Sequence, residues 1–567
     1  MTEHTAPDPS TPPTFEQAVA ALTAPGQRFE TATVDIRGVE TTVFRNAPST
    51  LRDWWASARG RPDETYLVYE DERWSFGEVM AAVDGLAHAL VHDLGVEKGD
   101  RVAIGMRNYP EWIVAIAAIT SVGAISVSLN SWWTEDEMDF ALRDSGTSVL
   151  IADLDRAGRA ARTLVDAGID ALVVRAAGSA LPDRARHFGD VVDLSQTMPE
   201  VDLDPDDDAT ILYTSGTTGR PKGAVSTHRA IVQSLMGFAC RGAVERLRSP
   251  GAADDGEPLC FILVVPLFHV TGCVPVMMST FAGGVKLVIM YKWDPERALE
   301  LIERERVTNF VGVPTMSWDL LESPDFAGRD TSSLRSVGGG GAPAPPELVK
   351  RVESSFSRGR PSIGYGMTET NAYGPQNSGD DYVTHPRSTG RGTPILEVKV
   401  VDPDGETLPA GALGEICFKG PHLIRGYWNR PDATAETIVD GWLRSGDLGR
   451  IDDDGFVYVE DRAKDMILRG GENVYCAEVE AVIYEHPAVY EAAVFGVPHE
   501  RLGEEVAAAV HCKPGESVTA DELRAFVAER LAGFKVPASV SFHDTQLPRN
   551  ASGKILKRDL RDALTAD

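Results

Sequence analysis

A glycine- and hydroxyl-rich segment, Thr214–Gly223, has the residue types that bind phosphate. It follows the apolar stretch Ala209–Tyr213, which we expect to be a strand. Glycines let the backbone approach an anion closely, hydroxyl and backbone N–H groups surround it, and Lys222 adds positive charge. The P-loop of nucleoside triphosphatases is excluded, because Pro221 stands where its second glycine should be. The expected phosphate-binding residues are Thr214, Ser215, Gly216, Thr217, Thr218, Gly219 and Lys222.

Five further motifs follow in order along the chain. Together with the phosphate segment they resemble the adenylate-forming superfamily, which includes acyl-CoA synthetases, luciferases and peptide-synthetase adenylation domains. The resemblance covers residues 60–562. It implies that a carboxylate attacks the α-phosphorus of ATP and that the acyl group then passes to a thiol. The motifs are VPLFH (Val265–His269), GYGMTET (Gly364–Thr370), SGDL (Ser445–Leu448), DRAKD (Asp461–Asp465) and PRNASGK (Pro548–Lys554).

The resemblance assigns four residues to the first reaction step. Both reactants are anions, so the site must position them and neutralise charge on oxygen. Lys554 is expected between the substrate carboxylate and the α-phosphate, and Glu369 with Thr214 is expected to hold Mg²⁺. His269 is expected beside the carboxylate as a neutral hydrogen-bond donor. It is not expected to be a general base, because a carboxylate is already ionised at pH 7.

Further residues are assigned to the nucleotide by the same resemblance. Tyr365 is expected to stack on adenine, Asp447 to accept both ribose hydroxyls, and Arg462 to assist it. The remaining nucleotide-binding residues are expected to be Gly340, Ala342, Pro343, Gly364, Gly366, Met367 and Thr368.

Lys464 occupies the hinge position of the family, within residues 461–465. Rotation about such a hinge lets a mobile C-terminal cap present two faces in turn. One face carries Lys554 for adenylation. The other carries Arg469–Val474 for thioester formation, where Gly471 would leave room for the pantetheine arm of CoA.

The substrate is predicted from the residues expected to line the acyl pocket. The segment Phe261–Gly272 contains no acidic residue, whereas amino-acid-activating relatives place an aspartate there, so a free amino acid is disfavoured. We interpret the glycines Gly338–Gly341 as giving space. We therefore expect a medium- or long-chain fatty acid, with an aryl acid as the alternative. Free CoA is the expected acceptor, with a carrier protein as the alternative. The expected pocket residues are His269, Phe238, Phe310, Val313, Gly339, Gly341, Gly366 and Met367.

Strand and helix signals alternate through the elements that must position these residues. Arg101–Met106, Pro110–Ser121 and Ala124–Leu129 begin a series of strand–helix–strand units, which predicts a mostly parallel sheet covered by helices. After residue 385, short alternating segments separated by Asp-Gly turns predict a small antiparallel barrel or sheet. We therefore predict an α/β fold. It has a large body of two parallel-type sheets and a small β-barrel, and a small, mobile α+β C-terminal domain.

The predicted boundaries divide the chain into four parts. A disordered lead occupies residues 1–15, the body 16–460 with its β-rich part at 385–460, the hinge 461–465 and the cap 466–567. The Pro-rich N-terminus has no apolar core of a signal peptide. The longest apolar stretch, Trp112–Val127, is too short for a membrane span and predicts a buried helix followed by a strand. The six cysteines form no CxxC pair, as in a reduced protein, so a cytoplasmic location is expected.

The composition sets the electrostatic conditions for any ligand. The chain of 567 residues, long enough for about four compact units, has 55 Lys+Arg and 85 Asp+Glu, so its net charge is −30. This charge argues against a nucleic-acid partner. ATP, Mg²⁺ and CoA are the expected cofactors, and Arg549–Arg561, with five basic residues and one acidic residue, supplies local positive charge. A transient membrane contact, a monomer and a homodimer all stay open.

Overall fold

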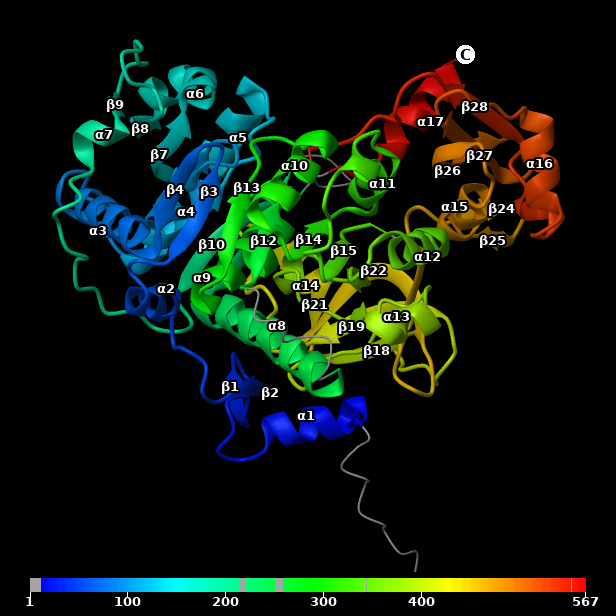
Figure 1. The fold of residues 1–567 in the computed structure, drawn as a ribbon, viewed down its shortest axis with the longest axis horizontal. Helices are drawn as coiled ribbons and strands as arrows, with labels where there is room; N and C mark the ends of the chain where they lie inside the picture. Colours follow the sequence, from blue (N-terminus) through cyan, green and yellow to red (C-terminus); the bar gives the residue numbers. More distant parts are fainter. Residues whose placement is uncertain (1–11, 215–220, 250–257, 343, 552, 567) are drawn as a thin grey trace, which may run out of the picture.

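The computed structural model describes residues 12–214, 221–249, 258–342, 344–551 and 553–566. They form a large body and a smaller cap, drawn in orange and red in Figure 1, which carries the C-terminus. The predicted α/β fold with a large N-terminal body and a small C-terminal domain is confirmed. Among the helices of these residues, none has the length and apolar character needed to cross a membrane.

The first sheet of the body has eight strands, and its five pairs from β10 to β9 are parallel. Parallel neighbours need a crossover, and α4 (Pro110–Ser121) supplies the one between β5 and β6. All residues of α4 except Glu111 are buried, which explains why its sequence is apolar all round. In spatial order the strands are β20 (Gly426–Tyr427), β11 (Lys222–Thr227), β10 (Asp208–Thr214), β6 (Ile125–Ser128), β5 (Arg101–Gly105), β7 (Thr147–Asp153), β8 (Asp170–Val174) and β9 (Ala185–His187).

The second sheet also has eight strands and is parallel from β3 to β16. Its side chains share one hydrophobic core with the first sheet, to which Val102 and Ile104 of β5 contribute, whereas Ala103 faces a second core. This alternation is the two-residue period of a strand. In spatial order the strands are β17 (Gln376–Ser378), β16 (Arg360–Gly364), β15 (Ser336–Gly340), β14 (Asn309–Gly312), β12 (Cys260–Leu263), β13 (Lys286–Ile289), β3 (Thr65–Tyr69) and β4 (Glu72–Ser75).

Helices surround these sheets (Figure 1). Besides α4, those of the body are α1 (Phe15–Thr23), α2 (Leu51–Ala56), α3 (Phe76–His92), α5 (Glu135–Ser145), α6 (Leu154–Ala167), α7 (Phe188–Val191), α8 (His228–Arg248), α9 (Ser279–Gly283), α10 (Pro295–Glu305), α11 (Pro314–Glu322), α12 (Pro346–Ser355), α13 (Gly379–Thr384) and α14 (Pro431–Thr437). A hairpin of β1 (Thr31–Ile36) and β2 (Val39–Phe44) follows α1.

The β-rich part of the body is a five-stranded antiparallel sheet. We expected a barrel, but among the described strands no hydrogen-bonded pair joins β18 to β23, so the sheet stays open. Its last hairpin, β22–β23, leads directly into the cap. The strands are β18 (Glu397–Val401), β19 (Gly414–Lys419), β21 (Ile438–Val439), β22 (Trp442–Ile451) and β23 (Val457–Arg462).

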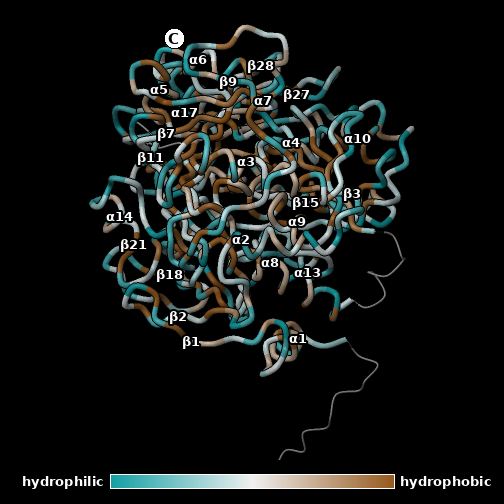
Figure 2. The backbone as a smooth tube through the Cα atoms, turned by 90° about the vertical axis from the view of Figure 1, so that its left-hand side faces the viewer, coloured by the Kyte–Doolittle hydropathy of each residue, from teal (hydrophilic) through white to brown (hydrophobic). Residues whose placement is uncertain are grey.

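The cap has its own sheet and its own hydrophobic cores. Both buried clusters of the cap consist only of residues from Ile467 onward, and the large core of the body ends at Val457. Figure 2 shows the hydrophobic segments gathered inside and the hydrophilic ones outside. The cap elements are β24 (Ile467–Arg469), β25 (Glu472–Val474), α15 (Cys476–Tyr484), β26 (Val489–His499), β27 (Gly503–Cys512), α16 (Ala520–Ala528), β28 (Ser539–His543) and α17 (Lys557–Ala566).

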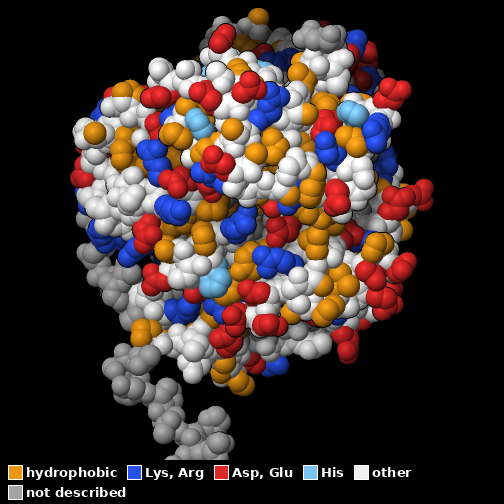
Figure 3. All heavy atoms as spheres, turned by 90° about the vertical axis from the view of Figure 1, so that its right-hand side faces the viewer, with side chains coloured by type: hydrophobic (Ala, Val, Ile, Leu, Met, Phe, Trp, Pro, Cys, Tyr) orange, Lys and Arg blue, Asp and Glu red, His pale blue; other side chains and the backbone are white. Residues whose placement is uncertain are grey.

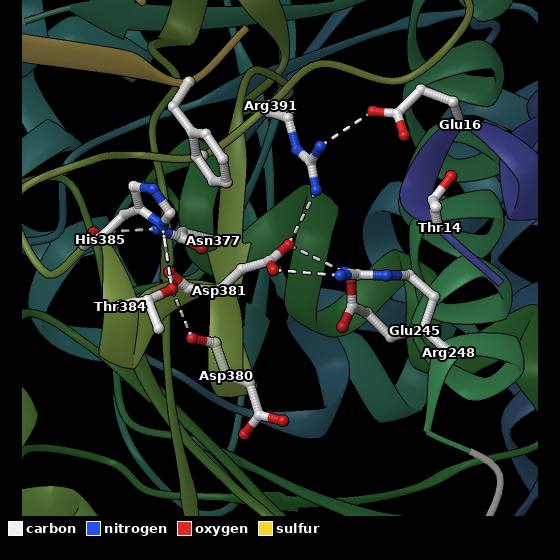
Figure 4. Close-up of polar contacts among 12 residues, drawn as sticks. Thr14, Glu16, Glu245, Arg248, Asn377, Asp380, Asp381, Thr384, His385 and Arg391 are labelled. Carbon is white, nitrogen blue, oxygen red and sulfur yellow. Dashed lines mark hydrogen bonds and ion pairs between the residues drawn. The ribbon is translucent and has the colours of Figure 1, made fainter. Parts of the chain in front are cut away.

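Helix α1 is fastened to the body by Arg391 (Figure 4). The guanidinium of Arg391 lies 4.2 Å from the ring centroid of Phe15, 2.9 Å from Glu16 and 3.0 Å from Asp381. Thr14 caps α1, whose first residue is Phe15. The predicted disordered lead at 1–15 therefore overlaps α1 by one residue. Residues 1–11 of that lead lie outside the described part of the chain.

Candidate active site

The two ends of the predicted phosphate-binding segment are held together. Thr214 ends β10 and Lys222 begins β11, and the two residues are paired across the antiparallel ladder. The hydroxyl of Thr214 donates to the carbonyl oxygen of Lys222 at 3.3 Å. Of the predicted phosphate ligands, Ser215, Gly216, Thr217, Thr218 and Gly219 lie outside the described residues, as does Pro343.

Glu369, the predicted metal ligand, is buried and oriented by Tyr427. The Tyr427 hydroxyl donates to Oε1 of Glu369 at 2.6 Å, and burial and this carboxylate raise the pKa of Tyr427. The ammonium of Lys222 lies 4.7 Å from the Tyr427 ring centroid. The sequence analysis missed Tyr427, because the residue belongs to no motif and lies 58 positions from Glu369 along the chain.

The predicted ribose site is built on the hairpin β22–β23. Asp447 and Arg462 are cross-strand partners, and Nε of Arg462 lies 3.3 Å from Oδ1 of Asp447. The Tyr365 hydroxyl donates to Oδ2 of Asp447 at 2.5 Å. Burial raises the pKa of Asp447, opposed by Arg462, by the Tyr365 hydrogen bond and by Lys554. The structure therefore brings these predicted nucleotide residues together.

Lys554 reaches this group of residues from the cap. It lies in a loop closed by the bridge Arg549↔Ile555, and its amide donates to Oδ1 of Asn550 at 3.0 Å. Burial and the charge of Arg462 lower the pKa of Lys554 to about 8, while Asp447 and Glu369 act in the opposite direction. The side-chain amine is therefore mostly protonated at pH 7, and both carboxylates stabilise its charge.

His269 is neutral and lies within electrostatic reach of Lys554. Burial, and then the Lys554 charge, lower the pKa of His269 to about 4. Its Nδ1 accepts from the backbone amide of Thr271 at 3.3 Å, so the ring proton is assigned to Nε2. A neutral imidazole with one N–H available is the form that the sequence analysis expected.

The glycine-rich strand β15 has a different role from the one predicted. A Cβ at Gly338 would lie 2.0 Å from Oγ of Ser362, one at Gly339 2.9 Å from the Gly312 oxygen, and one at Gly340 2.9 Å from the Gly364 oxygen. These three glycines therefore allow close strand packing and do not create space for substrate. Gly341 differs, because its Cβ would meet only Cε of Lys554, at 3.7 Å.

The remaining predicted pocket residues differ in their surroundings. Phe310 is fully buried against Trp293, with ring centroids 5.9 Å apart, so it is a core residue and its prediction as a pocket wall is wrong. Phe238 and Met367 are half-buried. Val313 contacts the Lys554 loop, since a Cβ at Gly553 would lie 2.9 Å from its Cγ2.

A close backbone approach explains the glycine at position 366, because a Cβ there would lie 2.4 Å from the Ala372 oxygen. The other nucleotide residues, Ala342, Gly364 and Thr368, are half-buried beside them.

The predicted hinge and thioester residues lie apart from Lys554 in the chain, and most of them are exposed, whereas Asp461 and Val474 are buried. Asp461 and Arg462 are still part of β23, so the predicted hinge at 461–465 begins inside a strand. Lys464 is exposed. Gly471 is exposed in the β24–β25 turn with a φ of +93°. In this orientation the cap directs Lys554, and not Gly471, at the body.

A magnesium ion would fit this site only together with nucleotide. Within the described residues no group of three or more His, Cys, Asp or Glu side chains could hold a metal ion. Mg²⁺ at nucleotide sites is commonly held by one or two carboxylates plus phosphate oxygens. The single oriented carboxylate of Glu369 suits that arrangement.

Comparisons with known proteins agree with this geometry. Residues 54–428 match the model of the AMP-binding enzyme family, and residues 478–554 match that of the AMP-binding enzyme C-terminal domain. The chain belongs to this family. The resemblance to adenylate-forming enzymes is thereby confirmed, and the chain is an acid–thiol ligase of the acyl-CoA synthetase type.

Three of the most similar proteins align over nearly their whole length. Feruloyl-CoA synthase of Amycolatopsis sp is 38% identical over 506 residues, which cover 89% of this chain and 96% of that protein. The long-chain-fatty-acid–CoA ligase of Bacillus subtilis (strain 168) is 32% identical over 546 residues, or 90% and 93% of the two chains. The solved o-succinylbenzoate CoA synthetase from Bacillus subtilis, in complex with its acyl-adenylate intermediate, superposes with a TM-score of 0.74 at 31% identity, over 90% and 98%.

Proposed function

We propose that the chain activates a hydrophobic carboxylic acid and joins it to CoA in two steps. In the first, a carboxylate oxygen attacks the α-phosphorus of ATP, the bond to pyrophosphate breaks and acyl-AMP forms. In the second, the sulfur of CoA attacks the acyl carbonyl carbon, the thiol proton passes to solvent and AMP leaves. The observation that carries this proposal is the convergence of Lys554 with Asp447, Arg462 and Glu369.

Each of these side chains has a role that follows from its charge. Lys554 would neutralise the oxygens shared between the attacking carboxylate and the α-phosphate, the largest effect available in a reaction between anions. The Nε2–H of His269 would donate to the acyl oxygen. Asp447 would accept the ribose hydroxyls in place of its bond from Tyr365. Glu369 would hold Mg²⁺, which when bound would supply positive charge to the phosphate oxygens.

A compact, ring-containing acid is the substrate class that we propose first. The ring of Tyr373 is fully buried and packs edge-on against Phe238, with centroids 5.2 Å apart. The Tyr373 ring also packs against helix α8 at Gly237, where a Cβ would lie 2.4 Å from the ring. The space beyond Phe238 is therefore filled, which favours an aromatic acid over a long chain. Feruloyl-CoA synthase and the o-succinylbenzoate enzyme, by their names, act on acids of this kind.

A medium- or long-chain fatty acid is the second candidate. It was the first choice of the sequence analysis, and the relative from Bacillus subtilis is named for a long-chain fatty acid. However, the three glycines of β15 taken as evidence of space, Gly338, Gly339 and Gly340, are explained by strand packing.

A panel of acids with ATP and CoA tests the proposal. Feruloyl-like and benzoyl acids should give CoA-dependent AMP release with higher kcat/KM than C8 to C18 fatty acids. Release of pyrophosphate without consumption of CoA would contradict free CoA as the acceptor and point to a carrier protein. A higher kcat/KM for fatty acids would reverse the order of the two candidates.

The Tyr373→Ala variant tests the depth of the pocket independently. Removing the ring should extend the accepted chain length and raise kcat/KM for C8 to C12 acids about tenfold relative to aromatic acids. Tyr382→Phe is the matched control, because Tyr382 is buried behind β16 in a separate cluster and should leave the acid preference unchanged.

A further inference from the structure

A hydrogen bond between side chains joins the cap to helix α11 of the body, outside the nucleotide site. Tyr490 of β26 donates its hydroxyl to Oδ1 of Asp319, which lies on α11 of the body. The other carboxylate oxygen of Asp319 accepts from the indole N–H of Trp293 at 2.8 Å. Both oxygens of Asp319 are therefore engaged, one with the body and one with the cap.

The cap side of this contact continues to the loop of Lys554. Glu491, which follows Tyr490, is buried, forms an ion pair with Arg549 and accepts from the Leu547 amide at 2.8 Å. Arg549 in turn donates to the carbonyl oxygen of Gly553 at 2.7 Å. Adjacent residues of one strand thus bind the body and hold the loop.

The body side of the contact is the same helix that receives this loop. A Cβ at Gly553 would lie 2.9 Å from Cγ2 of Val313 and 3.8 Å from Cε of Met316, at the start of α11. Asp319 is one helical turn beyond Met316, so the two contacts lie along one side of α11. The loop and Tyr490 therefore dock on α11 together.

We propose that the Asp319–Tyr490 hydrogen bond holds the cap in the orientation that delivers Lys554, so that both are positioning residues for adenylation and not for thioester formation. The proposal rests on the two-step function proposed above. Rotation of the cap about residues 461–465 would carry Tyr490 away from α11. The bond can therefore stabilise only the orientation in which it forms.

If Asp319 and Tyr490 served only to stabilise the fold, replacing either residue would destabilise the body or the cap. Neither Asp319 nor Tyr490 belongs to a hydrophobic core of the body or the cap. Their loss should leave both domains folded and change only how the domains sit together. Hydrogen bonds to an ionised group suggest an effect of about 10-fold to 100-fold on the adenylation rate.

The test uses Tyr490→Phe, Asp319→Asn and the double variant in the full-length enzyme. Single-turnover pyrophosphate release measures adenylation, and conversion of synthetic acyl-adenylate with CoA measures thioester formation. We expect the first rate to fall about 10-fold to 100-fold and the second to stay the same or rise. The double variant should be no slower than the slower single variant, because both remove one bond.

The matched control is Tyr484→Phe, whose hydroxyl bonds to the Ala492 oxygen within the cap. It should change neither rate. An unchanged adenylation rate in Tyr490→Phe, or an equal loss in both half-reactions, would overturn the proposal.

Hydrogen–deuterium exchange does not depend on enzymatic activity, so it distinguishes a failure of the docking proposal from a failure of the proposed function. In the enzyme without substrates, Tyr490→Phe should increase hydrogen–deuterium exchange at residues 549–555, and Tyr484→Phe should not. Unchanged exchange would contradict the docking role. If the wild-type enzyme activates no acid but the exchange changes as expected, the proposed function fails and the docking contact stands.

Discussion

At the scale of single residues, the charges of the site are prepared before any ligand arrives. Lys554 is a half-buried cation, and its charge is destabilised by Arg462 and stabilised by two carboxylates. Asp447 is a buried carboxylate that Tyr365 and Arg462 already satisfy. Such preorganised groups need little rearrangement when negative charge develops on substrate oxygens.

Replacing Lys554 by alanine should abolish only the first half-reaction. Loss of a preorganised donor typically costs about 10²–10³ in rate, and a full charge is lost here. We expect adenylate formation to fall by at least about that factor, while supplied acyl-adenylate is still converted to thioester. Quenched-flow measurement of each half-reaction checks this, and an equal loss in both would contradict a role limited to adenylation.

The protonation of Lys554 should set the alkaline limb of the pH profile. Its pKa is lowered to about 8, so the charge needed for adenylation is present below that pH and lost above it. We expect kcat/KM for the acid to fall about tenfold per pH unit above pH 8, because this ratio reports the free enzyme. The residual activity of Lys554→Arg should lack this limb, since arginine stays charged. A flat wild-type profile to pH 9.5 would argue against Lys554 as the titrating group.

At the scale of elements, the site motifs could be predicted and the contacts between elements could not. Asp447 and Arg462 stand in motifs that resemble those of the adenylate-forming family, so the sequence analysis found both, and the structure pairs them across neighbouring strands. Tyr427 and Asp319 form hydrogen bonds with residues that lie 58 and 171 positions away along the chain. No local sequence motif identifies either residue. The glycines of β15 were misinterpreted because a glycine needed for strand packing and one facing a ligand have the same sequence signal.

The N-terminal helix α1 allows a test of which contact, the buried Phe15 ring or the Glu16–Arg391 ion pair, holds the helix on the body. Phe15 is 7% exposed and lies under the guanidinium of Arg391, whereas the side chain of Glu16 is 69% exposed. Phe15→Ala should therefore destabilise the body by about 3 kcal/mol. Glu16→Gln should cost less than about 1 kcal/mol, because exposed ion pairs contribute little. Urea denaturation of both variants checks the order, and similar losses would show that the ion pair anchors α1.

At the scale of the whole molecule, local charge matters more than total charge. The net charge is −30, but on the face that Figure 3 views from the cap side, basic and acidic side chains are interspersed. Screening lengths of about 8 Å at physiological salt let Lys222 and the basic residues of 549–561 act separately from distant acidic surface. An anionic substrate is therefore compatible with an acidic enzyme.

The separate cores of cap and body predict two unfolding transitions. No hydrophobic cluster of the cap includes a body residue, so the two units share few apolar contacts within the described chain. Calorimetry of the full-length enzyme should resolve two transitions, and an isolated fragment of residues 466–567 should reproduce one of them. A single transition together with an unfolded fragment would show that the cap depends on the body.

The pairing of Asp447 with Arg462 also restricts which insertions and deletions the protein can tolerate between β22 and β23. The two residues meet because the turn between β22 and β23, residues 452–456, and the register shift between Leu448 and Gly449 together set which residues pair. One inserted or deleted residue would shift the register and turn the side chain of Arg462 to the opposite face of the sheet. Substitutions of the exposed residues Asp453 and Asp454 should be accepted, whereas changes in the length of the turn should separate the ribose-binding carboxylate from its arginine.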